Sequence, residues 1–144
     1  SYSIRLELEL LSFDGKSLWE NSKEVTVKEN TSINVYEIPK DEFEKFDLKS
    51  SVLKVNWEEV KINYFFAKPK DLKLQKPNIE IKIINDFMIE ISSDVLAKDV
   101  FLSSENEVFF EDNYFDLLPN DKRIIKLSKA AKEIKVKSLF DTIK

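Results

Sequence analysis

Two pairs of acidic side chains have the residue type that glycoside hydrolysis uses. Glu7 and Glu9 stand two residues apart in an alternating segment, so both lie on one strand face, about 7 Å apart. A retaining glycosidase instead needs an acid and a nucleophile about 5–5.5 Å apart across a pocket. Because Arg5 shares that face, we interpret Glu7 and Glu9 as part of a solvated surface. Glu58 and Glu59 are adjacent and point to opposite faces, so they are weaker candidates still.

The densest acidic and aromatic cluster is the segment Glu111–Asp116. The carboxylates of Glu111, Asp112 and Asp116 are of the kind that binds Ca²⁺, but their spacing matches no calcium loop and the required glycine is missing. We therefore interpret the segment as a corner between two sheets. In that interpretation its aromatic rings are buried and its short polar side chains cap the backbone.

Aromatic side chains offer a second kind of chemistry, because sugar rings stack on exposed flat rings. Trp19 lies beside a predicted hairpin and is the best candidate for a sugar contact. Trp57, Tyr64 and Tyr114 lie inside strands or the corner, which favours core packing. A sugar site would also need converging polar groups around the ring.

Three absences restrict the chemistry further. The chain has no cysteine, which excludes thiol nucleophiles, disulfides and thiolate metal sites. It has no histidine, the usual general base near neutral pH, and its one glycine, Gly15, cannot build a glycine-rich phosphate cradle. We therefore predict no catalytic residue, no cofactor-binding residue and no metal ligand. Missing cysteine is compatible with any compartment, and we favour the cytoplasm only slightly.

The distribution of charge restricts the partners. The 144 residues carry a net charge of −4, with lysine and acidic residues mixed throughout. Nucleic-acid binding needs clustered basic residues, so we predict no nucleic-acid partner. No apolar run approaches the roughly 20 residues of a membrane-spanning helix, so we expect a soluble chain with no membrane partner. Only Arg5 and Arg123 are arginines, and bidentate clamps for carboxylate or phosphate are therefore scarce.

Strands are the elements that must position these residues, because apolar and polar residues alternate along most of the chain. The first strand, 4–10, is followed by a hairpin turn at Asp14–Gly15, since this dipeptide tolerates positive φ. The other predicted strands cover 18–27, 33–35, 52–57, 60–66, 79–83, 87–91, 98–102, 108–110, 123–127 and 134–138. A helical turn over 41–46 should cap the end of a sheet.

The segment 69–77 is the best domain boundary in the chain. Pro69 and Pro77 bracket a lysine-rich stretch that cannot be a central strand. We therefore expect two modules, residues 1–68 and 78–144, joined by the linker 69–77. Short strands at roughly ten-residue spacing favour an all-β protein with two small antiparallel β-sandwich modules in tandem.

The run Phe110–Pro119 is the most specific stretch of the chain for recognising a protein family. It resembles the most characteristic run of the terminal domain among the C-terminal immunoglobulin-like domains of glycoside hydrolase family 2 beta-mannosidases. The other runs that carry the resemblance are Leu10–Trp19, Tyr64–Phe66 with Pro69–Leu74, Ser92–Leu102 and Val136–Leu139. Together they cover essentially the whole chain, which implies two immunoglobulin-like β-sandwich modules.

The resemblance implies a parent enzyme, a retaining glycosidase that releases terminal β-linked mannose. Its catalytic glutamates would lie on a (β/α)8 barrel upstream in the same polypeptide, and that barrel would be the partner of this chain. The chain itself would be a non-catalytic accessory region with a structural, domain-packing role. The resemblance also identifies Asp112, Tyr114 and Asp116 as structural corner residues.

Two other functions stay open at this point. A carbohydrate-binding module would use Trp19 or another exposed ring. An adhesin-like β-sandwich module would have no link to glycosidases, since sandwiches recur across unrelated functions.

One departure from the family pattern concerns the first module. In that pattern the penultimate domain starts with one or two strands before the position of Ser1, so the first module is expected to be truncated at its N-terminus. Unpaired backbone groups would then remain beside Ile4–Leu10 or along the adjacent strand. We expect either a homodimer through that strand edge or a locally incomplete first module.

Overall fold

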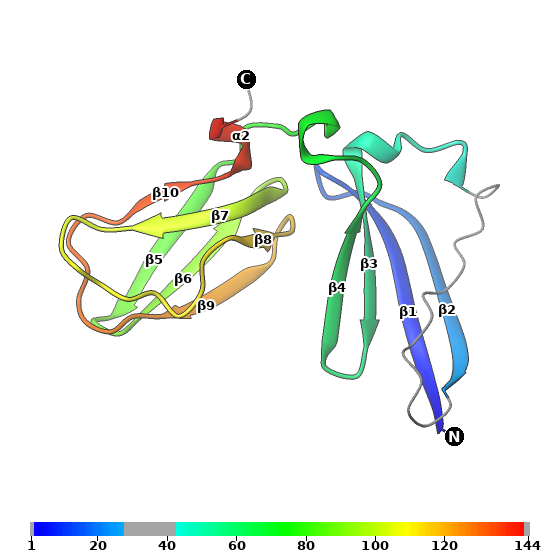
Figure 1. Ribbon diagram of the computed structural model, residues 1–144, viewed down its shortest axis with the longest axis horizontal. Coiled ribbons are helices and arrows are strands. Elements are labelled where there is room, and N and C mark those ends of the chain that lie inside the picture. The colour runs from blue at the N-terminus through cyan, green and yellow to red at the C-terminus, as the bar shows by residue number, and fades with distance from the viewer. Residues whose placement is uncertain (1, 28–42, 143–144) are drawn as a thin grey trace. The chain divides into compact units, whose positions relative to one another are not determined.

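The computed structural model describes residues 2–27 and 43–142, which form two compact units (Figure 1). Unit 1 comprises Ser1–Ser12 and Lys16–Leu72, and unit 2 comprises Phe13–Gly15 and Lys73–Lys144. The break after Leu72 falls inside the segment 69–77. No helix in the described ranges has the length and apolar character needed to cross a membrane.

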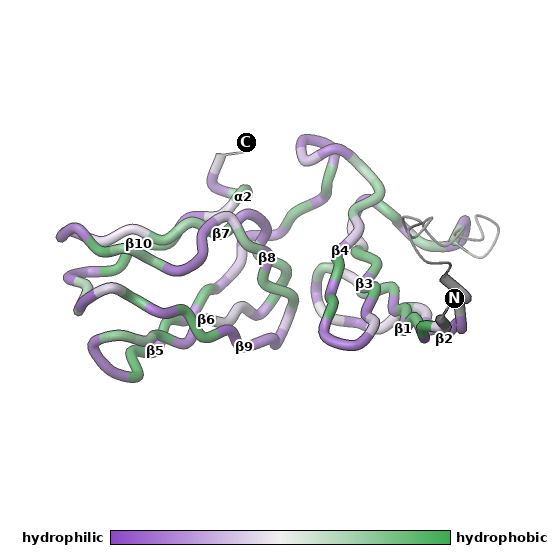
Figure 2. The backbone as a smooth tube through the Cα atoms, turned by 60° about the horizontal axis from the view of Figure 1, so that its bottom comes forward, coloured by the Kyte–Doolittle hydropathy of each residue, from purple (hydrophilic) through white to green (hydrophobic). Residues whose placement is uncertain are grey.

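Unit 1 contains a four-stranded antiparallel sheet with the order β2-β1-β3-β4. Its strands are β1 (Tyr2–Ser12), β2 (Ser17–Val27), β3 (Ser51–Trp57) and β4 (Val60–Phe65). Hydrophobic and hydrophilic residues alternate along such strands, as Figure 2 shows. In β1 this alternation buries Ile4, Leu6, Leu8 and Leu10 and leaves Arg5 and Glu7 exposed, as predicted.

The turn between β1 and β2 and the segment before β3 agree with the local sequence. Gly15 adopts φ +99°, so the predicted Asp14–Gly15 turn is confirmed. The N–H of Phe46 donates to the carbonyl of Phe43 at 3.0 Å, which forms the predicted helical turn as far as it is described. The short 3-10 helix η1 (Leu48–Ser50) follows, and a second, η2 (Pro69–Asp71), lies near the end of the unit. The predicted strand 33–35 and residues 41–42 of the turn lie outside the described residues.

The sequence analysis expected unpaired backbone groups beside Ile4–Leu10 or along the adjacent strand, and β1 is paired on both sides over only part of that range. From Glu7 to Leu10, β1 pairs with β2 on one side and with β3 on the other. These residues therefore belong to an interior strand. In the part of the sheet that the structure describes, the outer strands are β2 and β4.

Unit 2 is a β-sandwich of two three-stranded antiparallel sheets, with the orders β5-β6-β9 and β10-β7-β8 (Figure 1). Its strands are β5 (Ile79–Asn85), β6 (Met88–Ser93), β7 (Ala97–Ser103), β8 (Phe115–Leu117), β9 (Lys122–Lys126) and β10 (Lys135–Lys137). A four-residue helix, α2 (Leu139–Thr142), follows β10.

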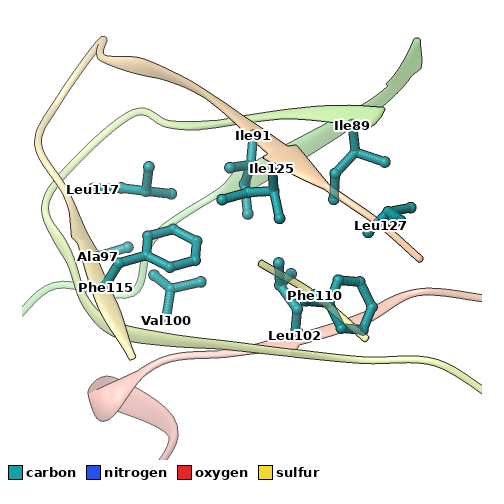
Figure 3. Packing of buried hydrophobic residues seen from close by; sticks show 10 residues of the cluster. All are labelled: Ile89, Ile91, Ala97, Val100, Leu102, Phe110, Phe115, Leu117, Ile125 and Leu127. Carbon is teal, nitrogen blue, oxygen red and sulfur yellow. The ribbon is translucent and has the colours of Figure 1, made fainter. Parts of the chain in front are cut away.

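The core of unit 2 lies between these two sheets. Side chains of β6 and β9 point toward those of β7 and β8 (Figure 3). Ile89, Ile91 and Ile125 from the first sheet and Val100 from the second are completely buried. Burial of each such aliphatic side chain contributes about 1.5–3 kcal/mol, so this cluster is the main source of stability of the unit.

Two local differences from the sequence expectations occur in unit 2. The predicted strand 108–110 is reduced to a single bridge between Phe110 and Leu127. Conversely, β8 forms inside the segment expected to be a corner, because Phe115 and Leu117 face the core while Asp116 between them does not.

Left-handed backbone is frequent for a chain with one glycine. Five non-glycine residues of the described ranges have φ between about 49° and 67°: Glu58, Asp99, Tyr114, Asn120 and Glu133. Such residues are uncommon because Cβ crowds the backbone there, and they mark turns or bulges. At Asp99 the cause is visible, since the pairing of β7 with β8 shifts between Ala97 and Val100.

Candidate functional site

An open depression of about 440 Å³ lies on the polar side of the sheet in unit 1. The residues that line it are Glu7, Leu8, Glu9, Glu20, Asn21, Ser22 and Asn56. The cross-strand register brings the polar side chains together, because Glu7 stands opposite Ser22 on β2 and opposite Asn56 on β3. Glu7 and Glu9, the first carboxylate pair considered in the sequence analysis, therefore lie at a concave surface.

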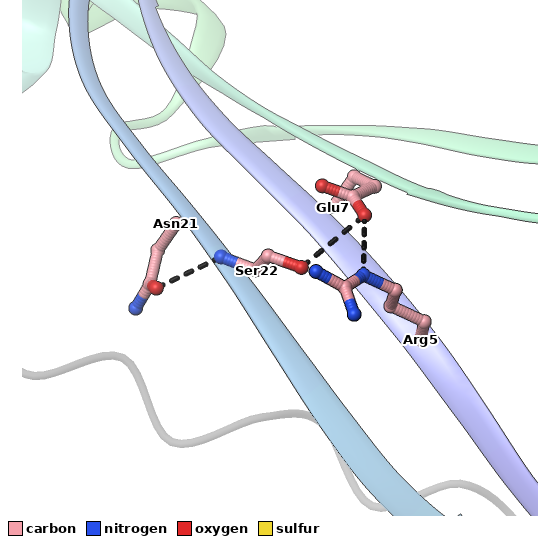
Figure 4. Close-up of polar contacts among 4 residues, drawn as sticks. All are labelled: Arg5, Glu7, Asn21 and Ser22. Carbon is pink, nitrogen blue, oxygen red and sulfur yellow. Dashed lines mark hydrogen bonds and ion pairs between the residues drawn. The ribbon is translucent and has the colours of Figure 1, made fainter.

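The Glu7 carboxylate has two polar partners on that surface (Figure 4). It accepts hydrogen bonds from Nε of Arg5 at 3.0 Å and from Oγ of Ser22 at 3.2 Å. The side chains of Arg5 and Glu7 are 71% and 58% exposed. Glu7 therefore belongs to a solvated surface network, as predicted.

Glu9 has an acidic neighbour on one adjacent strand and a basic neighbour on the other. It stands directly opposite Glu20 on β2 and opposite Lys54 on β3, whose Nζ is 3.7 Å from its carboxylate. Like charges in opposite positions destabilise a sheet slightly, and Lys54 offsets that repulsion. The lining contains no aromatic ring, so the depression can offer hydrogen bonds to a polar ligand but no stacking surface.

Trp19 lies elsewhere, on the apolar side of the same sheet. Its ring meets the ring of Phe43 edge to face, with centroids 4.9 Å apart, and it packs on the cluster that contains Leu10. Edge-to-face contacts of this kind stabilise a core. The suggested sugar contact of Trp19 stays a prediction, and this packing favours a structural role.

The corner of unit 2 uses its polar side chains to satisfy the backbone of β7. Oδ1 of Asn113 accepts a hydrogen bond from the N–H of Leu102 at 2.7 Å. Oδ1 of Asp116 accepts one from the N–H of Asp99 at 3.0 Å and lies 3.6 Å from Nζ of Lys98. Asp116 thus supports the bulge at Asp99, where regular strand pairing is interrupted.

A second group of contacts connects this corner to the opposite sheet. Asp112 forms an ion pair with Arg123 of β9 and accepts a hydrogen bond from the N–H of Asn113. The guanidinium of Arg123 also lies 4.6 Å from the centroid of the Phe115 ring, within cation–π range. Sequence reasoning missed Arg123 as part of this site, whereas Asn113 lies in the segment whose short polar side chains were expected to cap the backbone.

Two rings are more exposed than the sequence analysis expected. Tyr114 is 68% exposed, although its N–H donates to the carbonyl of Val100 at 2.6 Å and its ring lies 5.1 Å from that of Phe101. Its left-handed backbone turns the side chain away from the core, whereas Phe115 is buried as expected. Tyr64 of β4 is 48% exposed, because β4 is an outer strand of the described sheet.

The carboxylate of Asp94 has a lowered pKa in the folded chain. Asp94, in the turn after β6, accepts hydrogen bonds from the backbone N–H of Asn78 at 2.9 Å and from its side-chain amide at 2.8 Å. These bonds favour the charged form and lower the pKa of Asp94 below its usual value of 3.8. Asp94 therefore ties the residue before β5 to the end of β6.

No three acidic side chains of the described ranges lie close enough together to hold a metal ion. In particular, the structure does not bring Glu111, Asp112 and Asp116 together as ligands. Oε1 of Glu111 accepts a hydrogen bond from the N–H of Lys126 at 3.1 Å, while Asp112 and Asp116 have the partners described above.

The fold defines a class: tandem antiparallel β modules of the immunoglobulin-like type. Comparison with protein families specifies this class. Residues 1–71 match the mannosidase Ig/CBM-like domain family, and residues 74–142 match the Ig-fold domain family of mannosidases. The chain therefore belongs to the mannosidase immunoglobulin-like families and carries both domains in tandem, as the sequence resemblance implied.

A solved structure has the same fold. The crystal structure of beta-D-mannosidase from Dictyoglomus thermophilum superposes with a TM-score of 0.65 at 24% sequence identity. The match covers 95% of this chain but only 18% of the mannosidase chain. A search of curated proteins found no match.

Proposed function

We propose that this chain is the non-catalytic C-terminal accessory region of a beta-mannosidase, a retaining enzyme that releases terminal β-linked mannose. The observation that carries the proposal is the order of the two family matches, a mannosidase Ig/CBM-like domain followed by a mannosidase Ig-fold domain. The role is structural: the two domains pack against a catalytic barrel of the same polypeptide.

The polar side chains support a structural role. Asn113 and Asp116 bind backbone N–H groups of β7, and Asp112 pairs with Arg123. Glu7 and Glu9 have cationic neighbours on an open surface.

The first test uses the 144-residue chain alone with a chromogenic β-mannoside. We expect no turnover above that of a heat-denatured control. Turnover that disappears in a Glu7→Gln, Glu9→Gln double variant would contradict the proposal, because it would place catalysis on the β1 face.

The second test uses the complete enzyme and separates a structural role from sugar binding. Leu102→Ala loosens the core of unit 2, so we expect thermal inactivation at a lower temperature with unchanged KM at 25 °C. Lys122→Ala, an exposed position on β9, is the matched control and should change neither quantity. A raised KM with unchanged thermal inactivation would argue for a substrate-binding role instead.

Carbohydrate binding is the second candidate, and the depression on unit 1 is the observation that favours it. Carboxylate, hydroxyl and amide groups of Glu7, Ser22 and Asn56 converge there. Calorimetry against manno-oligosaccharides should compare the natural chain with Asn56→Ala and Trp19→Ala. Heat that is lost in Asn56→Ala alone would locate sugar in the depression, and the absence of heat in the natural chain would exclude this candidate. No observation favours an adhesin-like module.

A further inference from the structure

The strand β5 of unit 2 has one side of its backbone without a strand partner. It is the first strand in the sheet order β5-β6-β9, and in the described ranges it pairs with β6 alone, from Ile79 to Asn85. An exposed edge of this kind is a template for pairing with another strand. Proteins usually protect such edges with charged side chains, prolines, bulges or a covering segment. In β5 the register shifts between Ile83 and Asn85, and the residues from Ile79 to Ile83 pair regularly.

The side chains of β5 divide into two rows. Glu80 and Lys82 lie on the outer face of the sandwich and are both exposed. Ile79, Ile81 and Ile83 lie on the face that points toward the core. Ile83 is 66% exposed even though its cross-strand partner, Ile89, is completely buried. The apolar row therefore extends beyond what the opposite sheet of the sandwich covers.

The alternating charges make this edge complementary to itself. Two copies of an edge strand related by a two-fold axis perpendicular to the sheet pair antiparallel, so the register is specified by the residue at the axis. An axis at Glu80 or at Lys82 places identical charges opposite each other, which is unfavourable. An axis at Ile81 places each Glu80 opposite Lys82 of the second copy.

We propose that the outer edge of β5 is a surface for homodimerisation, at which two copies of this chain pair their β5 strands antiparallel about Ile81. The two sheets β5-β6-β9 then join into one continuous six-stranded sheet across the axis. Ile83 of each copy lies opposite Ile79 of the other, which covers the side chain that the single chain leaves exposed. Two Glu–Lys pairs form on the outer face. This surface lies on unit 2 and is distinct from the edge of the first module considered above.

Charge exchange tests the register directly. In the proposed register, position 80 of one copy faces position 82 of the other. In Glu80→Lys and in Lys82→Glu these two positions have the same charge, so each variant should dimerise at least about tenfold more weakly than the natural chain. The double variant Glu80→Lys, Lys82→Glu exchanges the charges and should restore dimerisation. An equimolar mixture of the two single variants should also form a heterodimer, because each strand then faces opposite charges.

Sedimentation velocity of the 144-residue chain, in a concentration series up to roughly 1 mM, measures these equilibria. Lys122→Glu, which makes the same charge change at an exposed position of β9, is the control and should leave dimerisation unchanged. Far-UV circular dichroism verifies that each variant is folded. A chain that is monomeric throughout the series would overturn the proposal. So would a dimer that is equally stable in both single variants, since it would use another edge.

Discussion

The depression on unit 1 and the corner of unit 2 are both rich in polar side chains, but these side chains have different partners. On the depression, Glu7 and Glu9 interact with Arg5 and Lys54, whose side chains also face solvent. In the corner, Asn113 and Asp116 accept hydrogen bonds from backbone N–H groups of β7. The acidic side chains of the depression therefore form ion pairs at the surface, whereas the acidic and amide side chains of the corner satisfy the backbone of β7.

The difference teaches where a polar cluster matters for folding. Exposed ion pairs contribute about 0–1 kcal/mol, because water replaces either partner at little cost. A backbone N–H that loses its partner in a part-buried position costs about 1–3 kcal/mol. The corner should thus be sensitive to substitution and the depression tolerant of it, unless the depression binds a ligand.

The largest expected effect tests whether the two units unfold separately. Leu102→Ala removes a completely buried side chain from unit 2 and should destabilise that unit by about 2–5 kcal/mol. Both tryptophans, Trp19 and Trp57, lie in unit 1. We therefore expect urea unfolding followed by far-UV circular dichroism to shift, while the tryptophan fluorescence transition stays in place. Equal shifts of both signals would show that the units unfold together.

A smaller loss is expected in the corner. Asn113→Ala removes the acceptor for the N–H of Leu102, and we expect a loss of about 1–3 kcal/mol in the unfolding of unit 2. Asn113→Asp retains an oxygen at the same place and is the matched control. If alanine and aspartate have equal effects in chemical denaturation, the hydrogen bond is not the cause.

Acid should reveal the contribution of Asp94. Its pKa is lowered in the folded chain by the hydrogen bonds from Asn78, so its stabilising effect is fully present above the unfolded value of 3.8. That effect is lost as the pH falls through the lower folded pKa. Denaturation of the natural chain and of Asp94→Asn should therefore differ at neutral pH and converge below pH 3.8. A difference that persists unchanged in acid would contradict this assignment.

The smallest effect is expected on the depression. Glu7→Gln retains the shape of the side chain but removes the charge that Arg5 faces, and the free energy of unfolding should change by less than about 0.5 kcal/mol. Fluorescence-detected denaturation of unit 1 measures this. A loss above about 1 kcal/mol would mean that the depression, like the corner, supports the fold.

The alternation of side chains predicted most of the described strands, because period two is a local property of the chain. It also predicted the turn at Gly15, where the Asp–Gly dipeptide selects the backbone conformation. The reduction of 108–110 to one bridge was not predictable in this way. It depends on which strand lies beside Phe110, and that is set by the packing of the whole unit.

The same distinction explains the site residues. The composition of the segment and the family resemblance predicted that Asp112 and Asp116 are corner residues. Their partners, Arg123 and the N–H of Asp99, lie on other strands, so spacing in the sequence contains no information on them. The exposure of Tyr114 depends on a left-handed φ that no local signal indicated.

The left-handed turns have a consequence for substitution in this chain. Most proteins place glycine where φ is positive, whereas here Glu58 and Glu133 carry full side chains in that region. Shortening a side chain usually destabilises a folded protein, and alanine is usually the mildest of the shortened replacements. At Glu58 and Glu133 the ranking is different. Glycine is the mildest replacement there, and valine or isoleucine, with branching at Cβ, is the most disruptive one.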